Sequence, residues 1–250
     1  MLSLSFLKTN TRFSDSCNGL STQRALNWRL IVLRRCAAFF ILLSLVSFSI
    51  HADGNKVESI DAFADSTAPE AIKSVLEPKG YRVSTKDGVL CDLWLRNGVP
   101  SQAKVDVSAV MYPELVDSAL VGVIVIPKQT KDYRGQVLKP GAYTMRYALH
   151  PIDGNHMGIS PNRDFLLLTP VSADTDANAK FTFVELTKMS MKTNGTNHAA
   201  PLSLVSPETP KEFPAVTEDD GGHVILTAKM KIQSGATIPL AIIVKGTAEQ

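Results

Sequence analysis

Potential metal ligands gather around one turn of the sequence. His150 ends an alternating segment, and Asp153, His156 and Met157 follow it closely. Imidazole nitrogens and a carboxylate suit Cu(II), whereas a methionine thioether suits Cu(I). Asp153 and Gly154 are also ordinary turn residues, so the same pattern fits an exposed turn that holds no metal. From spacing alone we favour the plain turn and keep copper as the alternative.

The sequence lacks the motifs of common enzyme and metal sites. It contains no HExxH, CxxC, G-x-S-x-G elbow, Walker loop or Rossmann fingerprint. His198 or His223 could serve a hydrolase together with a serine, but the members of a triad meet only in the fold. Arg134, beside Tyr133 in a polar loop, is a candidate for a binding surface. We therefore expect a non-catalytic binding or structural module, with copper binding as the alternative and a hydrolase as the weakest alternative.

Composition narrows the classes of partner. The net charge is only +2, which is too small to favour a nucleic acid, and the apolar content of 44% is ordinary for a globular protein. We expect a small ligand or a partner in the cell envelope. Contact with a membrane is expected only through the N-terminal segment, if that segment is not removed.

The N-terminal region resembles an export signal. Arg34 and Arg35 precede the uncharged, mostly apolar residues 36–50, a run that is short for a membrane span and suits the h-region of a signal peptide. Cleavage after Ala52 is acceptable, and cleavage after Ser49 is a second option. The alternative is an uncleaved anchor. We expect residues 1–52 to be the signal and the protein to be periplasmic or secreted.

Alternating apolar residues predict several strands. In residues 143–149 the aromatic and apolar side chains of Tyr143, Met145 and Tyr147 share one face, which indicates a half-buried strand. Residues 81–85 and 89–95 form a predicted hairpin over Asp87-Gly88. Further strands are expected at 119–126, which should be covered on both faces, and at 165–168, 202–205, 223–231 and 238–245.

Two positions within the predicted hairpin bear on its packing. Cys91 alternates with Leu93 and Leu95, which predicts a buried core thiol; no other cysteine follows residue 52. Trp94 lies on the opposite face. Either both faces of this strand are covered or Trp94 is partly exposed, and the sequence leaves both options open.

Helices are few. Thr67 is expected to cap a short helix at 67–76. Asp174 or Asp176 is expected to cap a second helix, which runs to about Lys192 and has Asn194-Gly195 at its C-terminal end. Residues 53–68 are polar and acidic, which indicates a flexible lead-in. We therefore expect residues 69–250 to form a single mainly β domain, an antiparallel Ig-like or transthyretin-like β-sandwich with a short N-terminal helix and one inserted helix.

Two resemblances bear on this interpretation. The LKPGAY segment at 138–143, followed by Asp153, Gly154, His156 and later Phe165, resembles the C-terminal hairpin of the small periplasmic copper-resistance carrier proteins. Those are Ig-like sandwiches, and the resemblance implies Cu(II) binding at Asp153 and His156. One residue is inserted before His156 relative to that pattern. The resemblance therefore supports the Ig-like fold more than the copper site.

The second resemblance covers more of the chain. Residues 76–81, 143–149 with 164–168, and 195–198 with 202–204 are similar to segments of a group of exported bacterial proteins with no assigned activity. This resemblance implies export and adds no chemistry.

Overall fold

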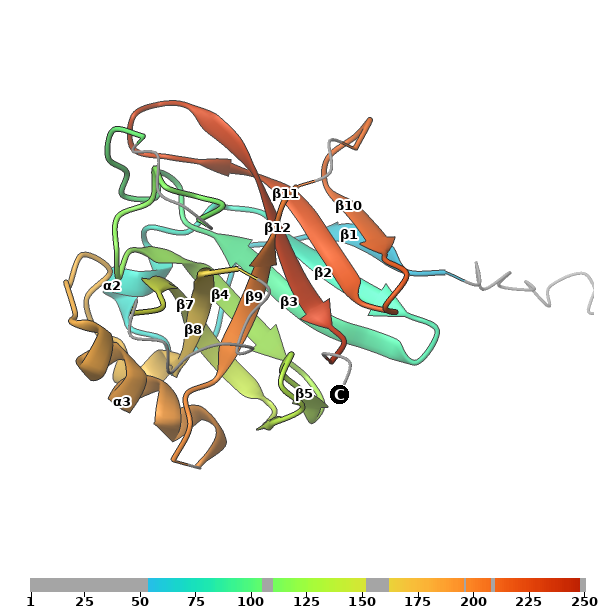
Figure 1. The fold of residues 1–250 in the computed structure, drawn as a ribbon, viewed down its shortest axis with the longest axis horizontal. Coiled ribbons are helices and arrows are strands. Elements are labelled where there is room, and N and C mark those ends of the chain that lie inside the picture. Colours follow the sequence, from blue (N-terminus) through green and yellow to red (C-terminus); the bar gives the residue numbers. More distant parts are fainter. Residues whose placement is uncertain (1–53, 105–109, 152–161, 196, 208–209, 248–250) are drawn as a thin grey trace, which may run out of the picture. The chain divides into compact units, whose positions relative to one another are not determined.

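A computed structural model describes residues 54–104, 110–151, 162–195, 197–207 and 210–247 (Figure 1). The chain divides into residues 1–52 and 53–250, and all described residues belong to the second unit. The expected signal peptide therefore lies outside the described residues. No helix in the described part has both the length and the apolar character that crossing a membrane requires.

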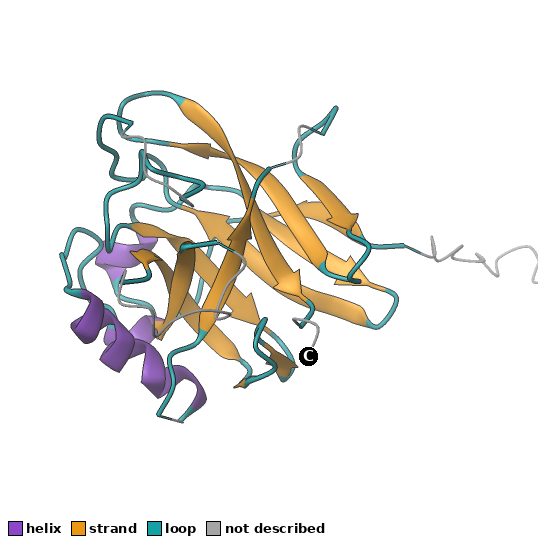
Figure 2. Cartoon of the chain, in the orientation of Figure 1, coloured by secondary structure: helices purple, strands orange, loops and turns teal. Residues whose placement is uncertain are grey.

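Strands make up most of the regular structure (Figure 2). They are β1 (Lys56–Ile60), β2 (Gly80–Thr85), β3 (Gly88–Leu95), β4 (Leu120–Ile126), β5 (Thr130–Lys131), β6 (Val137–Leu138), β7 (Gly141–Leu149), β8 (Asp164–Pro170), β9 (Pro201–Val205), β10 (Ala215–Glu218), β11 (Val224–Lys231) and β12 (Thr237–Lys245). The helices are α2 (Glu70–Lys73), α3 (Phe183–Asn194) and the 3-10 turn η1 (Val171–Ala173). The prediction of a mainly β, antiparallel fold with few helices is confirmed.

Ten strands form one antiparallel sheet in the order β1-β2-β3-β4-β7-β8-β9-β12-β11-β10. The sheet curves until its two edge strands, β1 and β10, approach each other, so that it nearly closes into a barrel (Figure 1). Asn55 Nδ2 donates to Glu218 Oε2 across this seam, at 2.7 Å. Strands β5 and β6 form a separate small hairpin.

The inner face of the sheet holds the main core. Tyr143, Met145 and Tyr147 of β7 all point into it, which confirms the predicted apolar face of that strand. The opposite face was expected to be exposed, and this expectation is wrong. Thr144, Arg146 and Ala148 are buried as well, because the chain after β8 and helix α3 cover that face.

Arg146 shows how the outer face of β7 is covered. Its Nε and Nη2 donate to Asp174 Oδ2 and Oδ1 at 2.7 and 2.8 Å, and Nη2 also donates to the carbonyl oxygen of Asp176. Its Nη1 donates to the carbonyl oxygens of Ser118 and Ala179. The buried guanidinium therefore fixes the loop after η1 to the sheet.

A second apolar cluster covers the outer faces of β3 and β4. Trp94 is only 7% exposed and packs against Phe63 and Ile72 there, while its indole N–H donates to the carbonyl oxygen of Asp61. Both faces of β3 are thus covered, which settles the alternative for Trp94. Cys91 lies in the main core as predicted, and burial raises the pKa of its thiol to about 12.

The structure corrects the expected starts of both helices. Thr67 does not cap α2, because its N–H and hydroxyl both donate to Asp65; the cap position is Pro69, and the helix is shorter than expected. Helix α3 begins after Thr182, which forms a capping box with Glu185. Asp174, one of the expected caps, is instead the ion-pair partner of Arg146.

Four short strands, β1, β5, β6 and β10, were missing from the sequence prediction. Strand β1 lies within the expected lead-in, where it pairs with β2 from Lys56 opposite Ser84 to Ile60 opposite Gly80. Strand β10 lies after the proline-rich loop and pairs with β11. Strands β1 and β10 have few apolar residues, so each of them depends on its neighbouring strand for its structure.

Candidate functional site

The structure describes one of the four copper candidates. Asp153, His156 and Met157 lie outside the described residues. His150 follows β7, is 8% exposed, and stacks its ring on Phe165 with 4.1 Å between ring centroids. No group of three potential metal ligands occurs among the described residues. The copper site therefore stays a prediction.

His150 lines a small pocket between helix α3 and the sheet. The pocket has a volume of about 160 Å³, and we call it the α3 pocket. Its lining residues are Arg134, His150, Phe165, Leu167, Phe183, Thr187, Met191, Asn197, His198, Ala199 and Pro201. Six of these eleven residues are apolar, Thr187 is a polar residue of α3, and the other polar residues lie outside the regular elements.

The regular elements explain why the apolar walls face each other. Phe165 and Leu167 are two residues apart on β8, so both point to the same side of the sheet. Phe183, Thr187 and Met191 are each four residues apart on α3 and share one side of that helix. Helix and strand thus present matched faces across the pocket.

Polar anchors hold α3 in place against the sheet. The Thr193 hydroxyl donates to the carbonyl oxygen of Leu168 at 2.9 Å, and the Ala200 N–H donates to Ser190 Oγ at 2.9 Å. Gly195 ends the helix with φ of 71°, a left-handed conformation that favours glycine, as the sequence predicted. The chain that follows supplies Asn197, His198, Ala199 and Pro201 of the lining.

Arg134 comes to the pocket from the turn between β5 and β6. Asp132 Oδ1 accepts hydrogen bonds from the backbone N–H groups of Arg134 and Gln136, which fixes this turn. Arg134 Nη2 donates to the carbonyl oxygen of Ala199 at 2.7 Å. The guanidinium therefore connects the turn to the chain that follows α3.

The ion pair between Arg134 and Asp132 is incomplete. Nη2 and Oδ2 are 3.7 Å apart, beyond hydrogen-bond length, and the Asp132 side chain is fully buried. Among the described residues, Arg134 Nε and Asp132 Oδ2 are buried without a hydrogen-bond partner. Burial raises the pKa of Asp132, although the backbone hydrogen bonds and the Arg134 charge oppose this shift.

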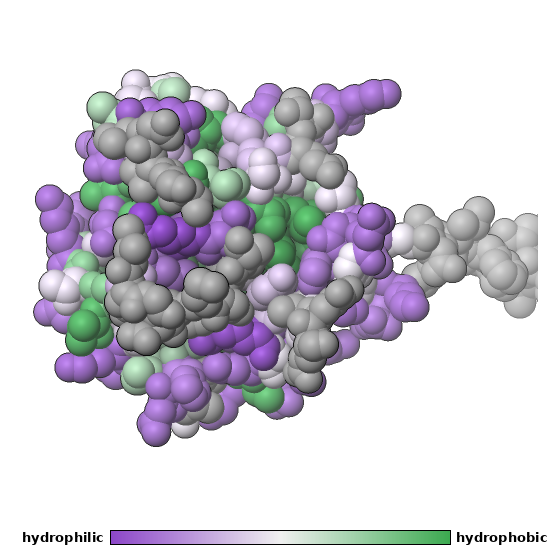
Figure 3. Space-filling view, in the orientation of Figure 1, coloured by the Kyte–Doolittle hydropathy of each residue, from purple (hydrophilic) through white to green (hydrophobic). Residues whose placement is uncertain are grey.

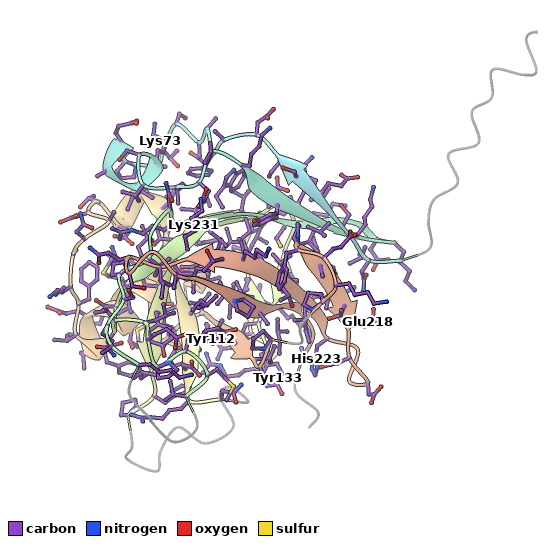
Figure 4. The ribbon with its side chains drawn as sticks, turned by 90° about the horizontal axis from the view of Figure 1, so that it is seen from above. Lys73, Tyr112, Tyr133, Glu218, His223 and Lys231 are labelled. Atoms are coloured by element: carbon purple, nitrogen blue, oxygen red, sulfur yellow. The ribbon has the colours of Figure 1, made fainter. Side chains whose placement is uncertain are left out.

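The hydrolase candidates are placed in different surroundings. His198 lines the α3 pocket and is exposed. His223 has Nδ1 2.9 Å from Asp219 Oδ2 and Nε2 3.1 Å from the carbonyl oxygen of Thr247. Both of these partners are acceptors, so neither ring nitrogen is oriented to take a proton from a serine. Figure 4 shows His223 beside Tyr133. The centroids of the two rings are 5.4 Å apart.

The surface around α3 is mixed in character. Figure 3 shows mainly hydrophilic residues on the face drawn, with small hydrophobic areas, one of them at the side where α3 lies in Figure 1. Val184 of α3 is 58% exposed, whereas Leu186 of the same helix is buried. The helix therefore presents Val184 outward and its pocket residues inward.

Sequence analysis identified three of the pocket residues separately, as unrelated candidates. Arg134, His150 and His198 were each considered for a different role, and the fold brings them to one pocket. Thr187 and the apolar walls gave no sequence signal beyond helix and strand periodicity. Comparisons of the chain with protein-family profiles, with curated proteins and with solved structures gave no match.

Proposed function

We propose that this chain is an exported, non-catalytic binding protein of the cell envelope whose small ligand occupies the α3 pocket. The observation that carries the proposal is the pocket itself, whose apolar residues from β8 and α3 lie beside a small number of polar groups, among them Arg134 and Thr187. Small-molecule sites in proteins typically have this character. Export is supported by the pattern of residues 1–52.

The volume limits the size of the ligand. At about 160 Å³ the α3 pocket is near the size of an engineered apolar cavity of about 150 Å³ that binds benzene. It is smaller than typical drug-sized sites, which start at about 300 Å³. We therefore infer a ligand, or an anchoring part of a ligand, of about the size of one aromatic ring.

Filling the pocket tests this function. In Met191→Trp the larger side chain occupies the space between α3 and β8, whereas Val184→Trp adds the same side chain on the exposed side of the same helix. Benzyl alcohol and benzoate should raise the melting temperature of wild type and Val184→Trp, because a ligand that binds the folded state stabilises it. The melting temperature of Met191→Trp should stay unchanged. Equal stabilisation of all three proteins would contradict the proposal.

Copper binding is the second candidate, and it rests on the sequence around His150, Asp153, His156 and Met157. It predicts one-to-one uptake of Cu(II) with nitrogen coupling in the electron paramagnetic resonance spectrum, lost in His156→Ala. Weak binding that this substitution leaves unchanged would remove the candidate. A hydrolase, the weakest alternative, would turn over simple ester substrates.

We also propose the finer fold assignment, an Ig-like or transthyretin-like sandwich. Support comes from the main core, in which β3, β4 and β7 contribute one wall and β11 and β12 contribute the other. Strand β9 connects these two halves by pairing with both β8 and β12. The near-closure of β1 onto β10 favours a barrel-like variant of such a sandwich.

A further inference from the structure

We propose that the ligand of the α3 pocket is a small aromatic carboxylate, of the size of benzoate, anchored by Arg134. This inference rests on the proposed function and adds the chemical class of the ligand. Two features of the pocket carry it, the arrangement of its aromatic rings and the state of its single arginine, together with the position of Asp132, which neighbours that arginine.

The rings favour a flat ligand. Phe165 is stacked with His150 at 26° between ring planes, and it meets Phe183 edge-on at 86° with 6.5 Å between centroids. Aromatic groups prefer such offset and edge-to-face contacts. A planar ring entering this pocket would extend the same pattern, whereas a branched aliphatic group of equal volume would not.

Arg134 favours a single negative charge. It is the one lysine or arginine among the described residues that line the pocket, and it is fixed there by its bond to Ala199. Its Nε has no hydrogen-bond partner in the described part of the chain, so its donors are not all used. A carboxylate matches the guanidinium fork and forms stronger, charge-assisted hydrogen bonds than a neutral group does.

Asp132 does not act as the carboxylate partner that Arg134 would find in a ligand. Its Oδ1 already accepts two backbone N–H groups of the turn, and its Oδ2 is 3.7 Å from Arg134 Nη2. The carboxylate lowers the net positive charge of the site without completing the pair. A ligand carboxylate therefore competes with Asp132 for Arg134, and removing the charge of Asp132 should strengthen ligand binding.

The test compares two probes of nearly equal shape. Calorimetric titration of the full chain is carried out with benzoate and with benzyl alcohol, on wild type, Arg134→Gln and Asp132→Asn. We expect benzoate to bind wild type at least about tenfold more tightly than benzyl alcohol. Arg134→Gln should abolish this difference, and Asp132→Asn should tighten benzoate binding about threefold while leaving benzyl alcohol unchanged.

The outcomes separate the two proposals. Equal affinity of wild type for both probes would overturn the carboxylate class and leave the α3 pocket as a binding site. Binding of neither probe would overturn the proposed function, and the carboxylate class with it. A benzoate preference that persists in a folded Arg134→Gln protein would overturn the role of Arg134. The wild-type comparison decides the ligand class even if a variant fails to fold.

Discussion

Two arginine–aspartate pairs in this molecule differ in how fully their polar atoms are hydrogen-bonded. Arg146 and Asp174 are fully buried and joined by two short hydrogen bonds, and the remaining donors of Arg146 reach backbone carbonyl oxygens. Arg134 and Asp132 lie 3.7 Å apart, and each has a buried polar atom without a partner in the described residues. The first pair is saturated internally, and the second retains capacity for another group.

The difference distinguishes the structural role of Arg146 from the binding role that we propose for Arg134. A guanidinium has five N–H donors, and five hydrogen bonds from Arg146 are present, with the ring of Phe181 4.8 Å from its central carbon. Arg146 therefore has no N–H donor left for a ligand. Arg134 lies at the border of a pocket and is only partly satisfied. Burial of charge alone therefore does not indicate a site, and our proposal rests on the incomplete pairing of Arg134 beside the α3 pocket.

The largest expected effect is on the complete pair. Arg146→Met leaves Asp174 buried without its partner, so we expect a loss of about 3–5 kcal/mol in the free energy of unfolding. Urea denaturation followed by circular dichroism measures it. Arg82→Met is the control, because Arg82 pairs with Asp92 with its own side chain 41% exposed, so the change should cost clearly less, about 1 kcal/mol. Equal losses in both variants would contradict the structural role of Arg146.

The matched change at the incomplete pair should cost less. Arg134→Met removes one bond to Ala199 and a weak ion pair, and it also removes a buried Nε that lacks a partner. We expect the free energy of unfolding to change by less than about 1.5 kcal/mol, measured in the same urea experiment. A loss as large as that of Arg146→Met would show that Arg134 is primarily structural.

The smallest effect is a pH dependence at Asp132. Burial raises the pKa of this carboxyl in the folded protein, so the folded state binds its proton more readily than the unfolded state. Stability should therefore fall as pH rises from the unfolded pKa through the raised folded pKa. Asp132→Asn lacks this group, and the difference in stability between wild type and variant should change in that window. A constant difference across the window would contradict the raised pKa.

Sequence periodicity and turn residues predicted most of the long strands and the end of helix α3. The hairpin of β2 and β3, the buried strands β4 and β8, and the end of α3 at Gly195 all follow from local patterns and turn residues. Arg146 could not be placed correctly, because alternation assigned it to a face that only distant segments cover. Asp174 was expected to cap a helix for the same reason: its partner Arg146 lies 28 residues away.

The α3 pocket was beyond sequence reasoning. Its lining comes from the β5–β6 turn, the end of β7, strand β8, helix α3 and the chain that follows it. Each segment has its own local explanation, and no spacing rule connects them. Arg134 and His198 were visible as polar residues in loops, but only the paired positions of α3 and β8 bring them to one site.

Methionine methyl groups offer the most direct test of the central claim, that the α3 pocket binds a small ligand. Met191 lines the pocket, whereas Met230 is fully buried in the main core. In a ¹H–¹³C spectrum of the full chain labelled at methionine methyls, titration with benzoate should shift Met191 saturably and leave Met230 in place. A Met191 signal that stays unchanged, or shifts only in proportion with Met230, would contradict the account.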